Sequence, residues 1–365
     1  MAIKIFKTRE DLKKELRKRG LIFNDNELDR ALINYNYFNL FNGFETLLLE
    51  SKNPKKFDKV KLEDFIALYE FDKSFTSELS KCLSNIEEKL KACISHHFTA
   101  KYCSTINNTM QYTNKDNYMN PKENNATSSN YCRYHANYPF TKEQNKRIYN
   151  DFIRFSLFDS DFLNKLIDKN DYIEVSFYTS PSYSAPSNVA KYKNYPNVAV
   201  PFWVAIGTLT FGEIIRLTHY LKDDVLEEVL KDFGFQLSKR AEFLNMLDFL
   251  LCLRNSCAHG FLVNRFRTPN KYKINSSLKT AFYLKPKNTG SPSSVLSLFD
   301  VIKIVSYFED ISVLKILLNK ILLRNLISMG FKRGNKLNQK LLSRMGEKKY
   351  FKWRTIFSKN VKYIL

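Results

Sequence analysis

The chain has 365 residues, of which 44% are hydrophobic, so it can bury a sizeable core and form one large domain or two ordinary ones. Only 10 Gly and 10 Pro argue against a turn-rich all-β protein. The 58 Lys and Arg against 37 Asp and Glu give a formal net charge of +21. Nucleic acid is the usual partner of so basic a protein, and a basic but inert surface is the alternative.

The first part of the chain predicts three helices. Thr8 is a candidate N-cap and Gly20 a candidate end for a short basic helix. A second helix is expected to begin at Asn24 or Asp25, where apolar residues follow helical spacing. Apolar residues then recur every three or four positions over residues 62–98, which predicts a long amphipathic helix.

The middle of the chain alternates between irregular and helical sequence. Residues 103–141 are polar and lack a period, so we expect a variable insertion or mobile loop. Residues 142–168 predict a helix, and residues 175–202, rich in Pro, Ser and Tyr, predict an extended segment. Thr210 and Glu213 stand in capping-box register, which predicts the start of the next helix.

The last third of the chain predicts more helices. One is expected to be capped by Ser238 and to end at Gly260. A broken basic stretch follows over about residues 265–294, and a helical pattern resumes through Ile327. The tail, residues 331–365, has eleven Lys and Arg against one Glu. The expected fold class is therefore all-α with loop insertions.

The segment LLCLRNSCAHG, residues 250–260, places Arg254, Asn255 and His259 at the end of an apolar helix. Histidine can move a proton near neutral pH, and the planar fork of arginine suits phosphate oxygens. RNA carries its own nucleophile, the ribose 2′-hydroxyl, so such groups can cleave it without a metal. The structural alternative is that an Arg and a Gly are favourable at a helix end and that the His is only structural.

The spacing of the motif raises a geometric difficulty. Each residue of an α-helix turns by about 100°, so Asn255 and His259 share a face, whereas Arg254 and His259 diverge by about 140°. Either the helix breaks at the motif, or two copies of the motif meet across an interface. The second solution predicts a homodimer that forms through the motif helices.

Four blocks of the sequence resemble the Abi family of bacterial abortive-infection proteins, of the AbiD or AbiF type. They are LRKRGLIFNDNELDRALINYNYFNLFNGF, LYEFDKSFTSELSKCLSNIEEKLK, PFWVAIGTLTFGEIIRLTHYL and FLVNRF, in that order. The segment LRNSCAHG is similar to the Arg-x-x-x-x-His motif of HEPN ribonucleases. The nuclease halves of type VI CRISPR effectors carry the same motif. The resemblance covers about residues 12–266, apart from the loop after Cys103. The family commonly has a second polar or His residue where this chain has Gly260.

The resemblance implies a division of the chain and a function. Residues 1–266 would form a HEPN-like helical bundle with the insertion at about 103–141, and residues 267–365 would form a basic C-terminal helical extension. The family also implies ribonuclease activity, phage defence and a small structured RNA as partner.

By carry-over from the family, Arg254, Asn255 and His259 are the catalytic residues. Glu87 and Lys91 stand four positions apart in the second block and are expected to support the site. The alternative for this pair is a surface ion pair worth a few tenths of a kcal/mol, about 0.2–0.5.

The basic tail is the expected RNA-binding surface. Its cations can follow a phosphate backbone, and its aromatic rings can stack on unpaired bases. The alternative is that the aromatic residues dock the tail onto the bundle. The residues expected to bind RNA are Lys336, Lys340, Arg344, Lys348, Lys349, Lys352, Trp353 and Arg354.

Neither a metal nor a cofactor is expected. The six Cys form no Cys-x-x-Cys pair, and Cys252, Cys257 and His259 do not have the spacing of a structural zinc site. Cys257 is a weak candidate nucleophile, because the paired base would be only two residues away. The charged N-terminus and the lack of a run of about 18–20 apolar residues predict a cytoplasmic protein without a membrane segment.

The sequence therefore predicts an RNA-binding abortive-infection protein that acts as a metal-independent HEPN endoribonuclease associated with a structured small RNA. One alternative is a non-catalytic RNA-binding protein that uses the HEPN fold for ribonucleoprotein assembly. Another is a toxin that acts through protein contacts and whose charge only promotes solubility.

Overall fold

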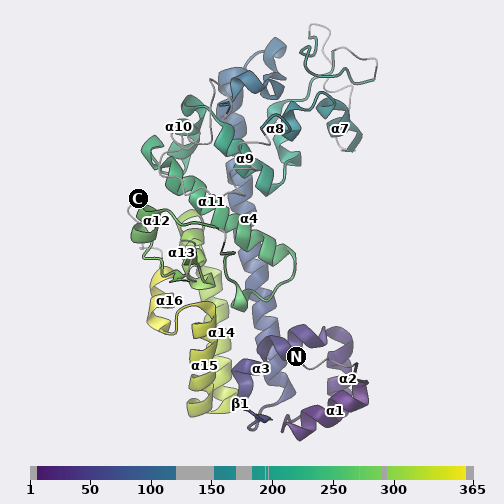
Figure 1. Cartoon of the computed structure of the whole chain (residues 1–365), viewed down its shortest axis with the longest axis vertical. Coiled ribbons are helices and arrows are strands. Elements are labelled where there is room, and N and C mark those ends of the chain that lie inside the picture. Colours follow the sequence, from purple (N-terminus) through teal and green to yellow (C-terminus); the bar gives the residue numbers. More distant parts are fainter. Residues whose placement is uncertain are drawn as a thin grey trace. The chain divides into compact units, whose positions relative to one another are not determined.

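The computed structural model describes residues 6–120, 152–169, 183–193, 195, 197–270, 272–288 and 294–358. Helices dominate these residues, which confirms the prediction of an all-α fold (Figure 1). The strands with a partner there form two short antiparallel hairpins, β1 (Leu49–Lys52) with β2 (Lys55–Phe57) and β3 (Lys287–Asn288) with β4 (Ser294–Val295). No helix of the described residues combines the length and apolar character needed to cross a membrane.

The chain folds as two compact units, each assembled from separated stretches. Unit 1 comprises Met1–Cys82, Leu253–Arg267 and Ser297–Lys362, and unit 2 comprises Leu83–Cys252, Thr268–Leu296 and Tyr363–Leu365. The C-terminal helices therefore belong to the same unit as the N-terminal helices and the end of the motif helix. The units cut across the boundary that the sequence led us to expect at residue 266.

The N-terminal helices of unit 1 begin where their caps predict. In α1 (Arg9–Lys18), Thr8 forms a capping box with Asp11, and α2 (Asp25–Asn34) begins after its N-cap Asn24. Helix α2 ends at Asn34 because Tyr35 is extended. A π-helical turn (Phe38–Asn42) and α3 (Gly43–Leu48) follow instead.

The longest helix, α4 (Leu62–Tyr102), has 41 residues and confirms the predicted amphipathic helix. Its apolar positions are buried at helical spacing. Phe65, Leu68, Phe75 and Leu79 lie in the core of unit 1, and Leu83, Ile86, Leu90 and Ile94 lie in the core of unit 2.

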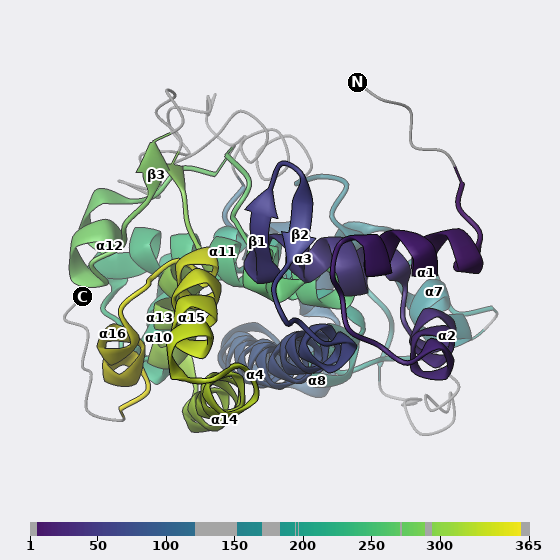
Figure 2. The same cartoon turned by 90° about the horizontal axis from the view of Figure 1, so that it is seen from below.

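The C-terminal part of unit 1 contains α13 (Leu298–Phe308), α14 (Ser312–Met329), α15 (Phe331–Met345) and α16 (Tyr350–Ile356). The expected long helix through Ile327 is broken at Glu309, which is extended. Helices α14 and α15 meet at Gly330, which has a φ of 76°, and lie side by side (Figures 1 and 2). Gly334 allows the close packing, because a Cβ there would lie 2.4 Å from the carbonyl oxygen of Asn325.

Unit 2 contains the remaining helices and most of α11. They are α7 (Phe162–Lys169), α8 (Phe202–Ala205), α9 (Phe211–Tyr220), α10 (Asp223–Asp232), α11 (Arg240–Ala258) and α12 (Ser276–Ala281). The predicted capping box of Thr210 and Glu213 at the start of α9 is confirmed. Ser238 is not the cap of α11, because it lies inside a 3-10 turn, Leu237–Lys239, that precedes the helix.

The first part of the insertion expected after Cys103 packs into unit 2. Residues 103–120 form short 3-10 turns in which Tyr112 and Tyr118 are buried, and the Tyr112 hydroxyl donates to the carbonyl oxygen of Val200 at 2.8 Å. Residues 121–141 lie outside the described residues. The helix expected over residues 142–168 starts only at Phe162 within the part that is described.

Candidate active site at the end of helix α11

The Arg254–Asn255–His259 motif occupies the last turn of α11, in unit 1. The helix is unbroken through Ala258, and the N–H of His259 donates to the carbonyl oxygen of Asn255 at 3.1 Å. The angle of about 140° between the directions of Arg254 and His259 therefore applies. The helix has no break between Arg254 and Ala258, and His259 directly follows its last residue.

The residue after the motif His ends the helix. Gly260 has a φ of 66°. Its N–H donates to the carbonyl oxygen of Cys257 at 3.2 Å, and the N–H of Phe261 donates to the carbonyl oxygen of Ser256 at 3.2 Å. These two bonds form a Schellman motif. No atom lies within 4 Å of a Cβ built on Gly260, so the backbone conformation rather than space favours glycine. His259 is thus the C-cap residue.

The three motif side chains are unengaged within the residues that the structure describes. Arg254 is half-buried, Asn255 and His259 are exposed, and none of the three side chains forms a hydrogen bond or ion pair there. The imidazole of His259 has a ring contact with Phe261, with centroids 6.2 Å apart. The end of α11 therefore presents a cation, an amide and an imidazole that are available to a ligand.

A buried carboxylate, which the sequence analysis missed, holds the turn after the motif. Asp72 is only 2% exposed and accepts hydrogen bonds from the backbone N–H groups of Val263, at 3.0 Å, and Asn264, at 2.8 Å. The side-chain amide of Asn264 donates to it at 2.7 Å. Burial raises the pKa of Asp72 to about 6, and these hydrogen bonds oppose the rise. The first half of α4 thus anchors the chain four residues after His259.

Two arginines complete this anchor. Arg344 donates to the carbonyl oxygen of Gly43 at 2.9 Å and to Oδ1 of Asn264 at 3.4 Å, and Arg265 donates to the Gly43 oxygen at 2.6 Å. A Cβ on Gly43 would lie 2.5 Å from Cδ1 of Leu262, so the post-motif turn packs tightly on the start of α3. Burial lowers the pKa of Arg344 to about 10. We define Asp72, Asn264 and Arg344 as the motif clamp.

Glu87 and Lys91, the expected supporting pair, form an ion pair with 2.9 Å between Nζ and Oε1. Their side chains are 16% and 11% exposed, so the pair is largely buried rather than on the surface. Lys91 also donates to the carbonyl oxygen of Gly207 at 3.5 Å. Within unit 2 the pair therefore ties α4 to the 3-10 turn after α8, and its support of the motif stays a prediction.

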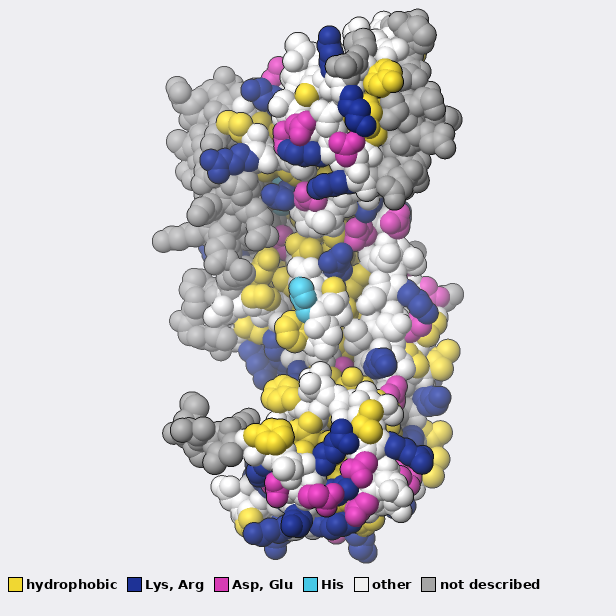
Figure 3. All heavy atoms as spheres, turned by 90° about the vertical axis from the view of Figure 1, so that its right-hand side faces the viewer, with side chains coloured by type: hydrophobic (Ala, Val, Ile, Leu, Met, Phe, Trp, Pro, Cys, Tyr) yellow, Lys and Arg dark blue, Asp and Glu magenta, His cyan; other side chains and the backbone are white. Residues whose placement is uncertain are grey.

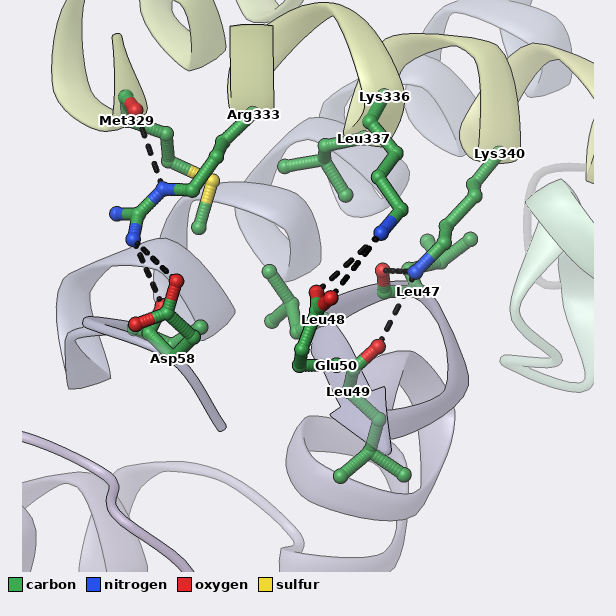
Figure 4. A pocket seen from close by; sticks show the side chains of 11 residues that line it. Leu47, Leu48, Leu49, Glu50, Asp58, Met329, Arg333, Lys336, Leu337 and Lys340 are labelled. Carbon is green, nitrogen blue, oxygen red and sulfur yellow. Dashed lines mark hydrogen bonds and ion pairs between the residues drawn. The ribbon is translucent and has the colours of Figure 1, made fainter. Parts of the chain in front are cut away.

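The cations of α15 contact the β1–β2 hairpin and its surroundings (Figure 4). Lys340 donates to the carbonyl oxygens of Leu47 and Leu49 at 3.0 and 3.1 Å, and burial lowers its pKa. Lys336 lies 3.3 Å from a carboxylate oxygen of Glu50. These residues line a cavity of about 40 Å³. Lys340 and Arg344 thus satisfy carbonyl groups of their own unit.

Trp353 does not face a ligand. It is 0% exposed, its indole N–H donates to the carbonyl oxygen of Glu347 at 2.7 Å, and its ring centroid lies 4.7 Å from that of Phe299. The expectation that Trp353 stacks on a base is therefore wrong, and the docking alternative holds for it. Lys352 forms an ion pair with Glu347 at 2.7 Å.

Three expected RNA-binding residues stay at the surface. Lys348 and Arg354 are exposed and form no hydrogen bond or ion pair with the described residues, and Lys349 is exposed near the ring of Phe351. Elsewhere, Lys and Arg side chains are interspersed with Asp and Glu on the coloured parts of one face (Figure 3). Lys348, Lys349 and Arg354 form the free part of the predicted RNA surface.

The Cys257 thiol is a poor candidate for the nucleophile. Burial raises the pKa of the Cys257 thiol to about 11, so the thiolate is scarce near neutral pH and the nucleophile alternative is disfavoured. The described residues contain no group of three or more His, Cys, Asp or Glu side chains that could hold a metal ion.

These features define a basic all-α protein with a polar motif at an intact helix end and a clamped turn behind it. A family model described as "Abi-like protein" matches residues 30–263, which is more than half of the chain. The chain therefore belongs to the Abi-like protein family, and the resemblance is confirmed at that level. Family membership suggests abortive infection, a form of phage defence. No curated protein and no solved structure matches the chain.

Proposed function

We propose that this protein is an RNA-binding abortive-infection protein that acts in the cytoplasm as a metal-independent endoribonuclease of the HEPN type and associates with a structured small RNA. The observation that carries the proposal is the set of unengaged side chains of Arg254, Asn255 and His259 at the end of an intact helix. The motif clamp supports it, because a preorganised site needs a rigid turn next to its reacting groups.

In the proposed reaction, His259 takes the proton of a ribose 2′-hydroxyl, and the 2′-oxygen attacks the adjacent phosphorus. The bond to the 5′-oxygen breaks, and that oxygen takes a proton from a general acid. Arg254 stabilises the negative charge of the crowded phosphate, and Asn255 binds a phosphate oxygen or orients the imidazole. The products are a 2′,3′-cyclic phosphate and a 5′-hydroxyl.

The intact helix favours a site composed of two chains. One chain supplies one His259, whereas the reaction needs a base, an acid and a cation. A two-fold axis that brings two α11 ends together supplies two copies of Arg254, Asn255 and His259 and removes the difficulty of the 140° angle. The proposed active species is therefore a homodimer.

The test compares RNA cleavage by the wild type and by His259→Ala. We expect a loss of at least about 10²-fold, the scale for removing one preorganised group, with an almost unchanged melting temperature because His259 is exposed. His96→Ala, which removes an exposed His in unit 2, is the matched control and should cleave like the wild type. Equal cleavage by His259→Ala and the wild type rejects the catalytic assignment.

The mechanism predicts that cleavage survives EDTA and that 2′-deoxyribose at the scissile position blocks it, because the 2′-hydroxyl is the nucleophile. Activity that is lost in EDTA and restored by divalent ions counts against it. RNA that copurifies with a protein unable to cleave supports the alternative of a non-catalytic RNA-binding protein.

A further inference from the structure

Helix α14 carries a row of exposed aliphatic residues. Val313, Ile316, Leu323 and Ile327 are 45%, 64%, 59% and 76% exposed, and the exposed Lys320 completes the row. Successive members are three or four positions apart, which places them on one side of the helix over roughly 21 Å, at about 1.5 Å per residue. Scattered exposed apolar residues are ordinary, but four of them aligned on one side of a helix, with a single Lys between the two pairs, are the pattern of an interaction surface.

A groove lies beside this row. Leu322, Leu323 and Leu326 of α14 line it together with Leu342 of α15, and its volume is about 450 Å³. The exposed Asn335, Gln339 and Lys348 also line it, as does Tyr350, whose hydroxyl donates to Asn319. Leu323 belongs to both the row and the groove, so the two form one surface. We call Val313, Ile316, Leu322, Leu323, Leu326, Ile327 and Leu342 the α14 surface.

The segment that carries the α14 surface is basic. Residues 312–346 contain eight Lys and Arg and no Asp or Glu. Some of these cations are used inside unit 1, as in the ion pair of Arg324 with Asp64 at 2.6 Å, but Lys320 stays exposed within the row. A second copy would bring the same cations to the interface, and like charges disfavour such pairing.

The aliphatic character of the exposed residues favours a protein partner over RNA. Unpaired RNA bases stack on aromatic rings and on the guanidinium group of arginine, whereas the exposed members of this row are Val, Ile and Leu. The spacing of three and four is the one with which two helices interlock their side chains. A straight row beside a groove between two helices therefore fits a helix.

We propose that the α14 surface binds an amphipathic helix of a partner protein, with apolar residues at three–four spacing and Asp or Glu on its flanks. The apolar side of that helix covers the row and the groove, and its carboxylates face Lys320 and the neighbouring cations. A partner helix of about four turns matches the length of the row. This interaction is separate from the motif and does not depend on the proposed ribonuclease activity.

The test uses a fluorescein-labelled 21-residue helical peptide, with Leu at the heptad a and d positions and Glu at e and g, and the full chain. We expect saturable binding in fluorescence anisotropy. Each of Ile316→Ser, Leu323→Ser and Ile327→Ser should weaken it by about 10-fold or more, because burying one such side chain favours association on that scale. Ile33→Ser and Ile106→Ser, which change exposed Ile residues elsewhere, should leave it unchanged.

A second peptide, with Lys in place of Glu and the same apolar residues, tests the charge requirement and should bind at least about 10-fold more weakly. The proposal is overturned if the Glu peptide does not bind, if both peptides bind equally, or if the three Ser variants bind like the wild type. It is also overturned if these variants instead lose binding to anionic lipid vesicles, binding to single-stranded RNA, or self-association in sedimentation. Circular dichroism checks that each variant is folded.

Discussion

The end of α11 and the helices α15 and α16 were both expected to contact RNA, and both belong to unit 1, yet the structure uses them differently. At the end of α11, the side chains of Arg254 and His259 form no hydrogen bond or ion pair among the described residues. In α15, Lys340 and Arg344 donate to backbone carbonyl groups, and in α16 Trp353 is fully buried. Basic residues that look alike in the sequence thus differ in the structure, since some donate to carbonyl oxygens of their own unit and others have no such partner.

The presence of buried carbonyl groups nearby distinguishes the two regions. The backbone oxygens of Gly43, Leu47 and Leu49 need donors because a buried carbonyl group without a partner is costly. Lys340 and Arg344 supply these donors, and the lowered pKa of each reflects the partial loss of water around its charge. Substitutions in the two regions should therefore affect different measurements.

The largest expected effect is on stability. Trp353→Ala should reduce the free energy of unfolding by about 3–5 kcal/mol, the usual cost of truncating a buried Trp. Urea denaturation measures this loss, and Phe351→Ala, at a position that is 61% exposed, is the control with a small effect. A stable Trp353→Ala protein that binds RNA more weakly would restore the role in base stacking.

The clamp should make stability depend on pH. The pKa of Asp72 is raised from 3.8 to about 6 in the folded protein, so between these values the folded state binds more protons than the unfolded state. The contribution of Asp72 therefore favours the fold most at low pH and falls as the pH rises through this window. The total fall is about 3 kcal/mol, at about 1.4 kcal/mol per pKa unit.

Asp72→Asn removes this titration. The difference in free energy of unfolding between the wild type and Asp72→Asn should therefore decrease from pH 4 to pH 6.5 and then level off. Denaturant titrations at several pH values measure it, and groups that titrate in both proteins cancel. A difference that is constant over the whole range would show that Asp72 keeps an ordinary pKa.

The dimeric site can be tested by mixing two inactive variants. Arg254→Ala and His259→Ala should each lose about 10²-fold in cleavage, and a heterodimer of the two keeps one Arg254 and one His259 on opposite chains. Partial recovery after subunit exchange, well above the activity of either parent, supports a composite site. A protein that is monomeric while it cleaves RNA would contradict it.

The smallest expected effect concerns the free cations of the tail. Replacing Lys348, Lys349 and Arg354 by Ala should lower the slope of the log of RNA affinity against the log of salt by about two units, at about 0.7 for each single-strand phosphate contact. A control variant with Lys73, Lys115 and Lys191 replaced has the same net charge and changes exposed residues elsewhere. Equal slopes in the two variants would place the RNA away from the tail.

Local signals predicted local structure well. Thr8 and Thr210 form their capping boxes, Gly260 ends α11, and apolar spacing located α4. Each of these features depends on residues a few positions apart, so a short stretch of sequence is enough to predict it. The motif residues were also found locally, because a cation, an amide and an imidazole are unusual at the end of an apolar helix.

Long-range features were missed for a physical reason. Asp72 lies 192 positions before Asn264, its hydrogen-bond partner, and nothing in the spacing of one stretch identifies the other. Trp353 was expected to stack on a base because cations surround it in the sequence. Its burial depends on contacts with Phe299 and Glu347, and the local pattern of charges does not reveal these contacts. The buried Tyr112 and Tyr118 were likewise hidden in polar sequence.

The order of the chain has a consequence for synthesis on the ribosome. Arg344, which closes the motif clamp on Asn264, lies 80 residues after it. At roughly 5–20 residues per second, a growing chain displays the motif for several seconds before Arg344 is translated. The clamp therefore closes only after the motif and the 80 residues that follow Asn264 have been translated, so the turn behind the motif becomes rigid later than the motif itself is made.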